Sequence, residues 1–144
     1  MTVIEAVSLA ARLHGAQTDK LGEPYLGHLV RVMLRLPTDA SDDENVAALL
    51  HDVIEDVPDG SRLLAEAGVP ARVIGLVATL TRRDGEDYDA FIDRVAGTPA
   101  RRVKRADVED NSDPGRLARL PAETRERLLK KYARAIRVLD GEQR

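Results

Sequence analysis

Apolar residues recur at helical spacing along nearly the whole chain, and this pattern constrains the fold more than any other feature. The first segment opens with a capping box formed by Thr2 and Glu5, and apolar residues follow at intervals of three and four. A second capping box, formed by Ser41 and Glu44, precedes a similar stripe. No segment shows a sustained alternation of β-branched and polar residues that would be typical of a strand. The sequence therefore predicts an all-α fold.

Proline and glycine divide this pattern into separate helices. Thr98 and Pro99 have the residue types of an N-cap and a first helical position, so a helix is expected to begin there. Pro114 and Gly115 are expected to end this helix. With 144 residues and no repeat or linker, one domain over residues 1–144 is expected. The predicted helices cover about residues 3–14, 26–36, 42 through the charged segment at 51–56, 60–67, 70–80, 87–96, 98–111 and 121–139.

Composition excludes several classes of protein. Cysteine is absent, so disulfides, thiol nucleophiles and cysteine metal sites are excluded. No apolar run is long enough for a transmembrane helix, and the first residues do not resemble a secretory signal, so a cytoplasmic location is expected. The net charge of -3 and an aromatic content of 3% do not favour nucleic acid as a partner. A membrane is not expected as a partner either.

The charges are distributed unevenly. Residues 1–60 contain 4 Lys or Arg and 11 Asp or Glu, a net charge of -7, and they include all three histidines. Residues 61–144 contain 18 and 14, a net charge of +4. Solvated helix faces are one explanation. The other is that the acidic half holds a metal and the basic half holds an anion.

The segment His-Asp-Val-Ile-Glu-Asp at 51–56 concentrates groups that could carry chemistry. On a continuous helix, His51 and Glu55 lie four residues apart, as do Asp52 and Asp56, so one imidazole and three carboxylates share a face. Such groups beside a buried apolar stripe repel one another unless a cation neutralises them. Imidazole and carboxylate ligands suit Mn²⁺, Mg²⁺, Fe²⁺ or Zn²⁺. The alternative is a solvated acidic helix end.

A second segment has the same character. Asp107 and Asn111 lie four residues apart on the predicted helix at 98–111, and Lys104 lies one turn before Asp107. Asp107 could be a further metal ligand. The alternative is a surface aspartate, since this helix is rich in charged residues.

Taken together, four ordered blocks resemble the hydrolase domain of RelA/SpoT proteins, a branch of the HD-domain phosphohydrolases. The resemblance covers about residues 4–112 and is closest to the small single-domain alarmone hydrolases. It implies a single HD-type helical bundle with Mn²⁺ in its centre, although another divalent metal could serve. The blocks are His-Gly-Ala-Gln at 14–17, Gly-Glu-Pro-Tyr-Leu-Gly-His at 22–28, Ala-Ala-Leu-Leu-His-Asp-Val-Ile-Glu-Asp at 47–56, and Val-Lys-Arg-Ala-Asp at 103–107, followed by Asn111.

The resemblance implies a role for individual residues. The reaction would be removal of the 3′-pyrophosphate of (p)ppGpp, the nucleotide of the stringent response, by an activated water. Glu55 and Asp56 would orient and deprotonate this water. The expected metal ligands are His28, His51, Asp52 and Asp107, and the resemblance also implies Lys20 and Asn111 as substrate contacts. Further expected substrate contacts are Tyr25, for which a core position is the alternative, and Arg82 and Lys104, which are basic candidates for phosphate binding or else solvated side chains.

One departure bears on the substrate. Asp19 stands where the family has an arginine that stacks on guanine, and only the following Lys20 is kept. Phosphohydrolysis is therefore expected, whereas guanine specificity does not follow. The alternatives are a phosphatase for another nucleotide, such as NADPH or a nucleoside monophosphate, and a nucleotide-binding HD module without turnover. The intact pair Glu55 and Asp56 argues against the last alternative.

Overall fold

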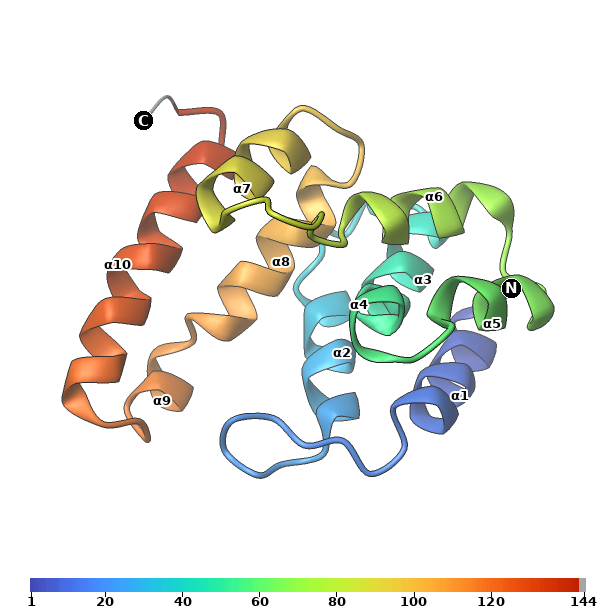
Figure 1. Cartoon of the computed structure of the whole chain (residues 1–144), viewed down its shortest axis with the longest axis horizontal. Helices are drawn as coiled ribbons and strands as arrows, with labels where there is room; N and C mark the ends of the chain where they lie inside the picture. The colour runs from blue at the N-terminus through green and yellow to red at the C-terminus, as the bar shows by residue number, and fades with distance from the viewer. Residues whose placement is uncertain (143–144) are drawn as a thin grey trace.

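The computed structural model describes residues 1–142 and contains ten helices over that range (Figure 1). The described residues form no strand, and a single antiparallel bridge joins Thr18 to Pro24. The predicted all-α fold is therefore confirmed. No helix in the described range is long and apolar enough to cross a membrane. The helices are α1 (Val3–His14), α2 (Tyr25–Leu34), α3 (Asp42–Leu50), α4 (Val53–Asp56), α5 (Gly60–Glu66), α6 (Ala71–Thr79), α7 (Tyr88–Ala96), α8 (Arg101–Asn111), α9 (Pro114–Leu117) and α10 (Ala122–Leu139).

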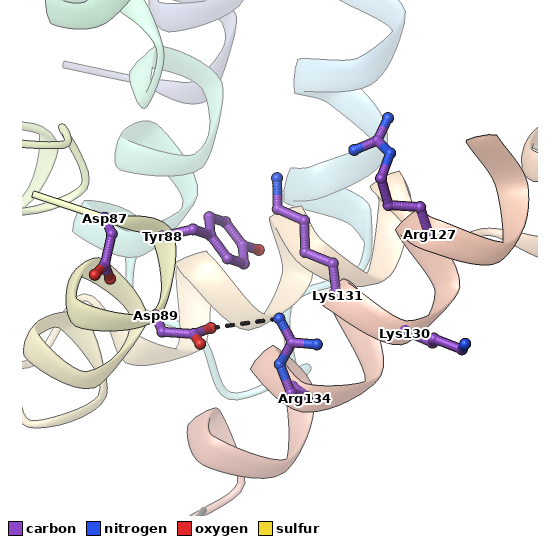
Figure 2. Close-up of a pocket in the computed structure, with 7 residues that line it drawn as sticks. All are labelled: Asp87, Tyr88, Asp89, Arg127, Lys130, Lys131 and Arg134. Carbon is purple, nitrogen blue, oxygen red and sulfur yellow. Dashed lines mark ion pairs between the residues drawn. The ribbon is translucent and has the colours of Figure 1, made fainter. Parts of the chain in front are cut away.

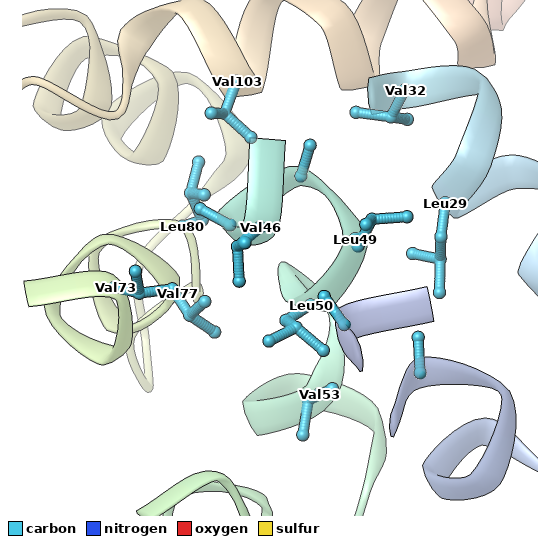
Figure 3. Close-up of a cluster of buried hydrophobic side chains, with 14 of the residues drawn as sticks. Leu29, Val32, Val46, Leu49, Leu50, Val53, Val73, Val77, Leu80 and Val103 are labelled. Carbon is cyan, nitrogen blue, oxygen red and sulfur yellow. The ribbon is translucent and has the colours of Figure 1, made fainter. Parts of the chain in front are cut away.

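The larger of two apolar cores surrounds α3. This helix packs against α1, α2 and α6, and every residue from Val46 to Leu50 is buried. Burial on all sides explains why the segment is apolar around most of its circumference. Figure 3 shows the centre of this core, to which α2, α6 and α8 also contribute. Its labelled members are Leu29, Val32, Val46, Leu49, Leu50, Val53, Val73, Val77, Leu80 and Val103.

The smaller core lies between α10 and the pair α7 and α8. Helix α10 presents Leu128, Tyr132 and Ala135 to this core, while α7 adds Ile92 and α8 adds Val108. Helix α8 belongs to both cores, because Val103 and Ala106 lie in the larger one. In Figure 1, α8 accordingly runs between α10 at one end of the molecule and α2 and α3 in the middle. Residues near its centre therefore face the interior.

The two predicted capping boxes form, whereas Thr98 does not become the N-cap of α8. Thr2 and Glu5 make a reciprocal capping box at the start of α1, and Ser41 and Glu44 make another at α3. Asp87 caps α7 by accepting a hydrogen bond from the backbone N–H of Ala90 (2.8 Å). These contacts satisfy N–H groups that have no partner within the helix.

Two predicted helix boundaries were wrong, and one short helix was not predicted. The helix expected to continue through residues 51–56 ends at Leu50, and α4 begins after a turn at His51 and Asp52. Helix α8 begins at Arg101, because the Thr98 hydroxyl accepts a hydrogen bond from the Ala100 N–H (3.2 Å) in the preceding turn. Pro114 lies beyond the end of the preceding helix and is the first residue of the short helix α9.

Candidate active site

Three buried side chains from separate elements meet beside α8. His28 comes from α2, His51 from the C-cap of α3 and Asp107 from the middle of α8. Each offers one donor atom, and the three atoms lie within 4.8 Å of one another. None of the three residues is more than 4% exposed. The structure thus brings together three of the four predicted metal ligands as one group.

The ring of His51 is oriented by the backbone of its own turn. Its Nδ1 donates to the carbonyl oxygen of Ala48 (2.7 Å), so that Nε2 faces the group. This Nε2 is buried and makes no hydrogen bond of acceptable geometry among the described residues, although Asp52 Oδ2 and Asp107 Oδ1 lie 3.1 and 3.4 Å from it. A buried nitrogen without a hydrogen bond is costly unless something else occupies its lone pair.

His28 is oriented by a carboxylate behind it. Its Nδ1 lies 2.8 Å from Oδ2 of Asp110, which is fully buried. Arg31 and Arg35 both donate to the other oxygen of Asp110, at 2.9 and 3.1 Å. Burial opposes ionisation of Asp110, but the hydrogen bonds from His28 and Arg31 outweigh it and lower its pKa to about 2. A carboxylate behind a histidine is a common support of metal ligands.

Asp110 was not among the predicted site residues, although a signal for it exists in the sequence. It follows Asp107 by three residues on α8, and Arg31 follows His28 by three residues on α2. Residues at this spacing lie on the same helix face. This spacing is what is expected if α2 and α8 pack face to face and each contributes a metal ligand and, one turn later, a supporting residue.

The fourth predicted ligand, Asp52, lies beside the group. Its Oδ2 is 3.1 Å from His51 Nε2 and 3.9 Å from His28 Nε2. The same oxygen accepts a hydrogen bond from the hydroxyl of Tyr25. Although burial favours the neutral acid, the neighbouring His51 outweighs it and lowers the pKa of Asp52 to about 2.

Asp107 has neighbours of both charges and is itself held from two sides. Lys104 donates to its Oδ2 (2.7 Å) and Asn111 donates to its Oδ1 (3.2 Å). Burial opposes its charge, but Lys104 and His51 outweigh this effect, so the pKa of Asp107 lies well below its usual value. Burial likewise opposes protonation of His51, yet the charges of Asp52 and Asp107 raise its pKa well above the usual value. Asp52 and Asp107 thus stay ionised and hold a positive charge on His51, which a divalent cation could replace.

The donor set fits a divalent metal. Two imidazole nitrogens and one or two carboxylates are ligands shared by Zn²⁺, Fe²⁺ and Mn²⁺ sites. The Nε2 of His51, buried without a hydrogen bond, is the observation that tests this fit, because a metal would occupy its lone pair. His28, His51 and Asp107 would hold the ion, with Asp52 in reach of the same position.

The acidic pair that follows does not share one helix face with His51 and Asp52. The turn at His51 and Asp52 separates α3 from α4, so the carboxylates contact different elements. Glu55 accepts a hydrogen bond from the backbone N–H of Arg82 (3.4 Å) and Asp56 accepts one from Gln17 (3.1 Å). The prediction of a common face was wrong because it assumed one continuous helix, and the turn interrupts that helix.

Glu55 and Asp56 are solvent-accessible, yet both are protonated more easily than free carboxylic acids. Partial burial is the main cause that raises the pKa of Glu55, and the charge of Asp52 adds to it. Partial burial also raises the pKa of Asp56. Gln17 holds Asp56 and in turn lies 2.9 Å from Nδ1 of the buried His14. A carboxylate with a raised pKa is better suited to accept a proton near neutral pH.

A cavity of about 290 Å³ opens beside His28. Three predicted substrate contacts, Lys20, Tyr25 and Asn111, line it, and Leu117 and Leu120 supply apolar walls. The fourth, Lys104, is paired with Asp107. The side chain of the fifth, Arg82, lies over the ring of Tyr88, with its guanidinium carbon 5.6 Å from the ring centre.

Asp19 forms part of the wall of this cavity and has a structural role there. Its Oδ1 accepts the backbone N–H groups of Leu21 and Glu23, at 2.9 and 3.0 Å. Its Oδ2 accepts a hydrogen bond from Arg116 (2.8 Å), whose guanidinium also lines the cavity. The cavity wall therefore has an arginine from α9, a helix that the sequence did not predict.

The helical bundle and its buried His/Asp group define a class of protein, namely an all-α domain with a central site for a divalent metal. The chain belongs to the HD domain family, whose profile matches residues 6–139. A solved structure supports this assignment. It is that of a metazoan ortholog of SpoT, described as hydrolysing ppGpp and as having a role in starvation responses, and it matches 94% of this chain and 85% of its own with a TM-score of 0.73 and 26% identity.

Curated relatives match a shorter part of the chain. A guanosine-3′,5′-bis(diphosphate) 3′-pyrophosphohydrolase of Aquifex aeolicus is 46% identical over 52 residues, which are 35% of this chain and 8% of that protein. The bifunctional (p)ppGpp synthase/hydrolase SpoT of Escherichia coli is 47% identical over 55 residues, or 38% and 8%. The matched segments therefore span less than a tenth of the length of these relatives.

Proposed function

We propose that this chain is a metal-dependent phosphohydrolase that removes the 3′-pyrophosphate of (p)ppGpp and that Mn²⁺ is its metal. The observation that carries the proposal is the buried donor group of His28, His51 and Asp107 beside two accessible carboxylates with raised pKa values. The SpoT hydrolases with which the chain shares its fold and part of its sequence act on this substrate according to their names. A location in the cytoplasm and a role in a stringent response stay predictions.

The residues divide the work of the reaction. A divalent metal, when bound, polarises phosphoryl oxygens and makes water more acidic. His28, His51, Asp52 and Asp107 would hold it. Glu55 accepts a proton from the attacking water, and Asp56, fixed by Gln17, orients that water.

The nucleotide would enter through the cavity beside His28. The bond that breaks joins the ribose 3′ oxygen to phosphorus, so pyrophosphate leaves and the ribose oxygen takes a proton. Asn111 and Lys104 lie close enough to Asp107 to contact the ribose and the 3′-phosphates. Lys20 and Tyr25 line the same cavity and would bind the remainder of the nucleotide.

One observation favours a second candidate substrate. The Asp19–Arg116 ion pair forms part of the cavity wall, whereas the resemblance to RelA/SpoT hydrolases implies an arginine in place of Asp19. A different wall could accept a different base, so the second candidate is a phosphatase for another nucleotide, such as NADPH or a nucleoside monophosphate.

A panel of nucleotides with added Mn²⁺ separates these candidates. Release of pyrophosphate from ppGpp is the expected result. Release of orthophosphate from another nucleotide, with ppGpp left intact, would replace the first candidate by the second. No release from any nucleotide, despite stoichiometric bound metal, would contradict both and favour a binding module.

A further inference from the structure

One buried histidine has no role in the reaction described above. His14 is the last residue of α1 and is 6% exposed, and its ring lies beside that of Tyr25 with the ring centres 5.3 Å apart. It does not belong to the group of donors formed by His28, His51 and Asp107. Burial of an imidazole costs free energy unless its nitrogens are hydrogen-bonded. The contacts of this ring therefore indicate its role.

The side chain of Gln17 determines which nitrogen of His14 carries a proton. Gln17 Nε2 lies 3.1 Å from Oδ2 of Asp56, and an ionised carboxylate only accepts hydrogen bonds. The amide nitrogen thus faces Asp56, and the amide oxygen faces the histidine. His14 Nδ1 lies 2.9 Å from that oxygen and must be the donor. His14 therefore donates to Gln17, and Gln17 donates to Asp56.

Packing alone does not explain an imidazole at this position. The second ring nitrogen of His14, Nε2, is buried and makes no hydrogen bond among the described residues. An apolar side chain of similar size would fill the space beside Tyr25 without leaving a nitrogen unsatisfied. Such a side chain could not donate to Gln17. The hydrogen bond from Nδ1, rather than the volume of the ring, thus accounts for the histidine.

The backbone of Gln17 is already fixed, so His14 restrains its side chain. The Gln17 N–H donates to the carbonyl oxygen of His14, and the Gln17 carbonyl oxygen accepts the N–H of Tyr25, both at 2.9 Å. Gly15 has a φ of 53°, which glycine adopts without strain, and this turns the chain back toward the end of α1. A glutamine side chain loses rotamer freedom when it is ordered, and the hydrogen bond from His14 offsets this loss.

Asp56 depends on this restraint because its own helix gives it little support. It is exposed and lies in the four-residue helix α4. Without Gln17 its carboxylate could take several rotamers, whereas a group that directs a water molecule must keep one geometry. We infer that His14 is a positioning residue of the reaction: through Gln17 it holds the carboxylate of Asp56 in the orientation that directs the attacking water. The inference rests on the proposed function, in which Asp56 has this role.

Kinetics of three variants test the inference. His14→Leu removes the donor, Gln17→Leu removes the link to Asp56, and His14→Asn keeps a donor, because asparagine Nδ2 is attached to Cγ as histidine Nδ1 is. His14→Leu and Gln17→Leu should each lower kcat for ppGpp roughly 10- to 100-fold and leave KM within about twofold, since the water loses its orientation while the nucleotide contacts stay. His14→Asn should restore kcat to within about threefold of the wild type.

A double variant shows whether the two residues act in one chain of hydrogen bonds. If His14 acts through Gln17, His14→Leu should lower kcat no further when position 17 is already leucine. Multiplication of the two losses in the double variant would overturn the inference, as would a wild-type kcat in His14→Leu. A loss in His14→Asn as large as that in His14→Leu would overturn it too, because it would indicate that only the packing of the ring matters.

Two controls separate positioning from a loss of stability and from a change of surface charge. Leu13→Ala removes a partly buried apolar side chain from the same helix, so it should lower the melting temperature and leave kcat within about twofold. Arg134→Gln breaks an exposed ion pair of 3.8 Å with Asp89 between α10 and α7 (Figure 2), at the end of the molecule opposite to α1 (Figure 1). It should change neither quantity, because exposed pairs contribute little. A loss of kcat in Leu13→Ala as large as that in His14→Leu would overturn the inference.

A spectroscopic measurement separates failure of this inference from failure of the proposed function. Nitrogen NMR of histidine-labelled protein reports which ring nitrogen carries a proton, and it needs no turnover. Zn²⁺ replaces the paramagnetic Mn²⁺, and the signals absent from His14→Asn are those of His14. The wild type should carry the proton on Nδ1, and Gln17→Leu should shift the Nδ1 signal.

The two kinds of failure then give different results. A proton on Nε2 alone in a wild type that hydrolyses ppGpp would overturn the inference and leave the proposed function intact. Hydrolysis of another nucleotide in place of ppGpp would overturn the proposed substrate, and the same kinetic comparison on that nucleotide would still support or overturn the role of His14.

Discussion

The two sides of the candidate active site are built in different ways. On the ligand side, His28 and His51 are almost fully buried, and each ring is fixed through its Nδ1 by a carboxylate or a carbonyl group. On the acidic side, Glu55 and Asp56 are accessible to solvent, and each accepts one hydrogen bond from another part of the chain. The two histidines are thus held by burial and by a hydrogen bond each, whereas Glu55 and Asp56 are held by a hydrogen bond each without enclosure.

The difference corresponds to two chemical requirements. Metal ligands must be held in place before the ion arrives, because reorganising buried groups costs free energy. A general base must reach both water and substrate, so it cannot be enclosed in the same way. Variants on the two sides should therefore separate metal binding from catalysis.

The largest effect is expected from removal of a ligand. His51→Ala and Asp107→Ala should each abolish stoichiometric metal binding and lower turnover by at least about 10³, because each deletes a donor from a small set. Metal content of the purified protein and phosphate release measure the two effects. The exposed Asp42→Ala in the first turn of α3 is a matched control and should retain metal. Full metal affinity in both ligand variants would contradict the site.

A substitution on the acidic side should affect the reaction alone. Glu55→Gln keeps the size of the side chain but cannot accept a proton, so turnover should fall by roughly 10² to 10⁴. Metal content should stay that of the wild type, since Glu55 contacts the Arg82 backbone rather than a ligand. Asp56→Asn, tested alone and together with Glu55→Gln, shows whether Asp56 shares the role. Unchanged turnover in all three variants would refute the mechanism.

The comparison also explains how far the sequence could predict the site. The ligand side rests on local signals, because the segments with His28, His51 and Asp107 lie in helices whose apolar stripes fix their inward faces. Their mutual proximity agrees with the prediction, as does the all-α fold. The assignment of Asp52 as a ligand, and the roles of Glu55 and Asp56, stay predictions.

The errors arose where long-range contacts override local pattern. The turn at His51 and Asp52 lies within a segment that reads as helix, but Asp52 is drawn to the Tyr25 hydroxyl of another element. Asp110 was missed because its role depends on His28, Arg31 and Arg35, which lie far from it in the sequence. No site residue was predicted on α10, because which of its faces is exposed depends on its docking against α7 and α8.

An effect of intermediate size on metal affinity is expected from a change at Asp110, the carboxylate that contacts His28. Asp110→Asn removes the charge that orients the imidazole and the carboxylate that Arg31 and Arg35 share, although Arg35 keeps its ion pairs with Glu109 and Asp113. Metal affinity should fall by about 10- to 100-fold, the usual effect of losing such a support. Glu109→Gln, which changes the neighbouring half-buried carboxylate on α8, is the control; it does not contact His28 and should bind metal as the wild type does. Equal affinity for Mn²⁺ in Asp110→Asn would show that His28 needs no support.

The smallest effect is expected from a change in the contact between α5 and α4, the helix that carries Glu55 and Asp56. Gly60 is buried where α5 begins, and a Cβ added there would lie 2.4 Å from the carbonyl oxygen of Val53 in α4. The clash is with backbone, so α4 must shift. Gly60→Ala should therefore lower the free energy of unfolding by about 1–3 kcal/mol. Since α4 carries Glu55, turnover should fall several-fold while metal affinity stays within about twofold.

Gly75→Ala is the matched control for this substitution. Gly75 lies inside α6, and a Cβ there would meet no atom within 4 Å. Alanine should stabilise this helix by roughly 0.5–1 kcal/mol, because glycine loses more backbone entropy on folding. Thermal unfolding should thus shift in opposite directions for the two variants. If Gly60→Ala lost metal affinity as strongly as turnover, the two sides of the site would be mechanically coupled, and the division between a fixed ligand side and a separately held acidic side would be wrong.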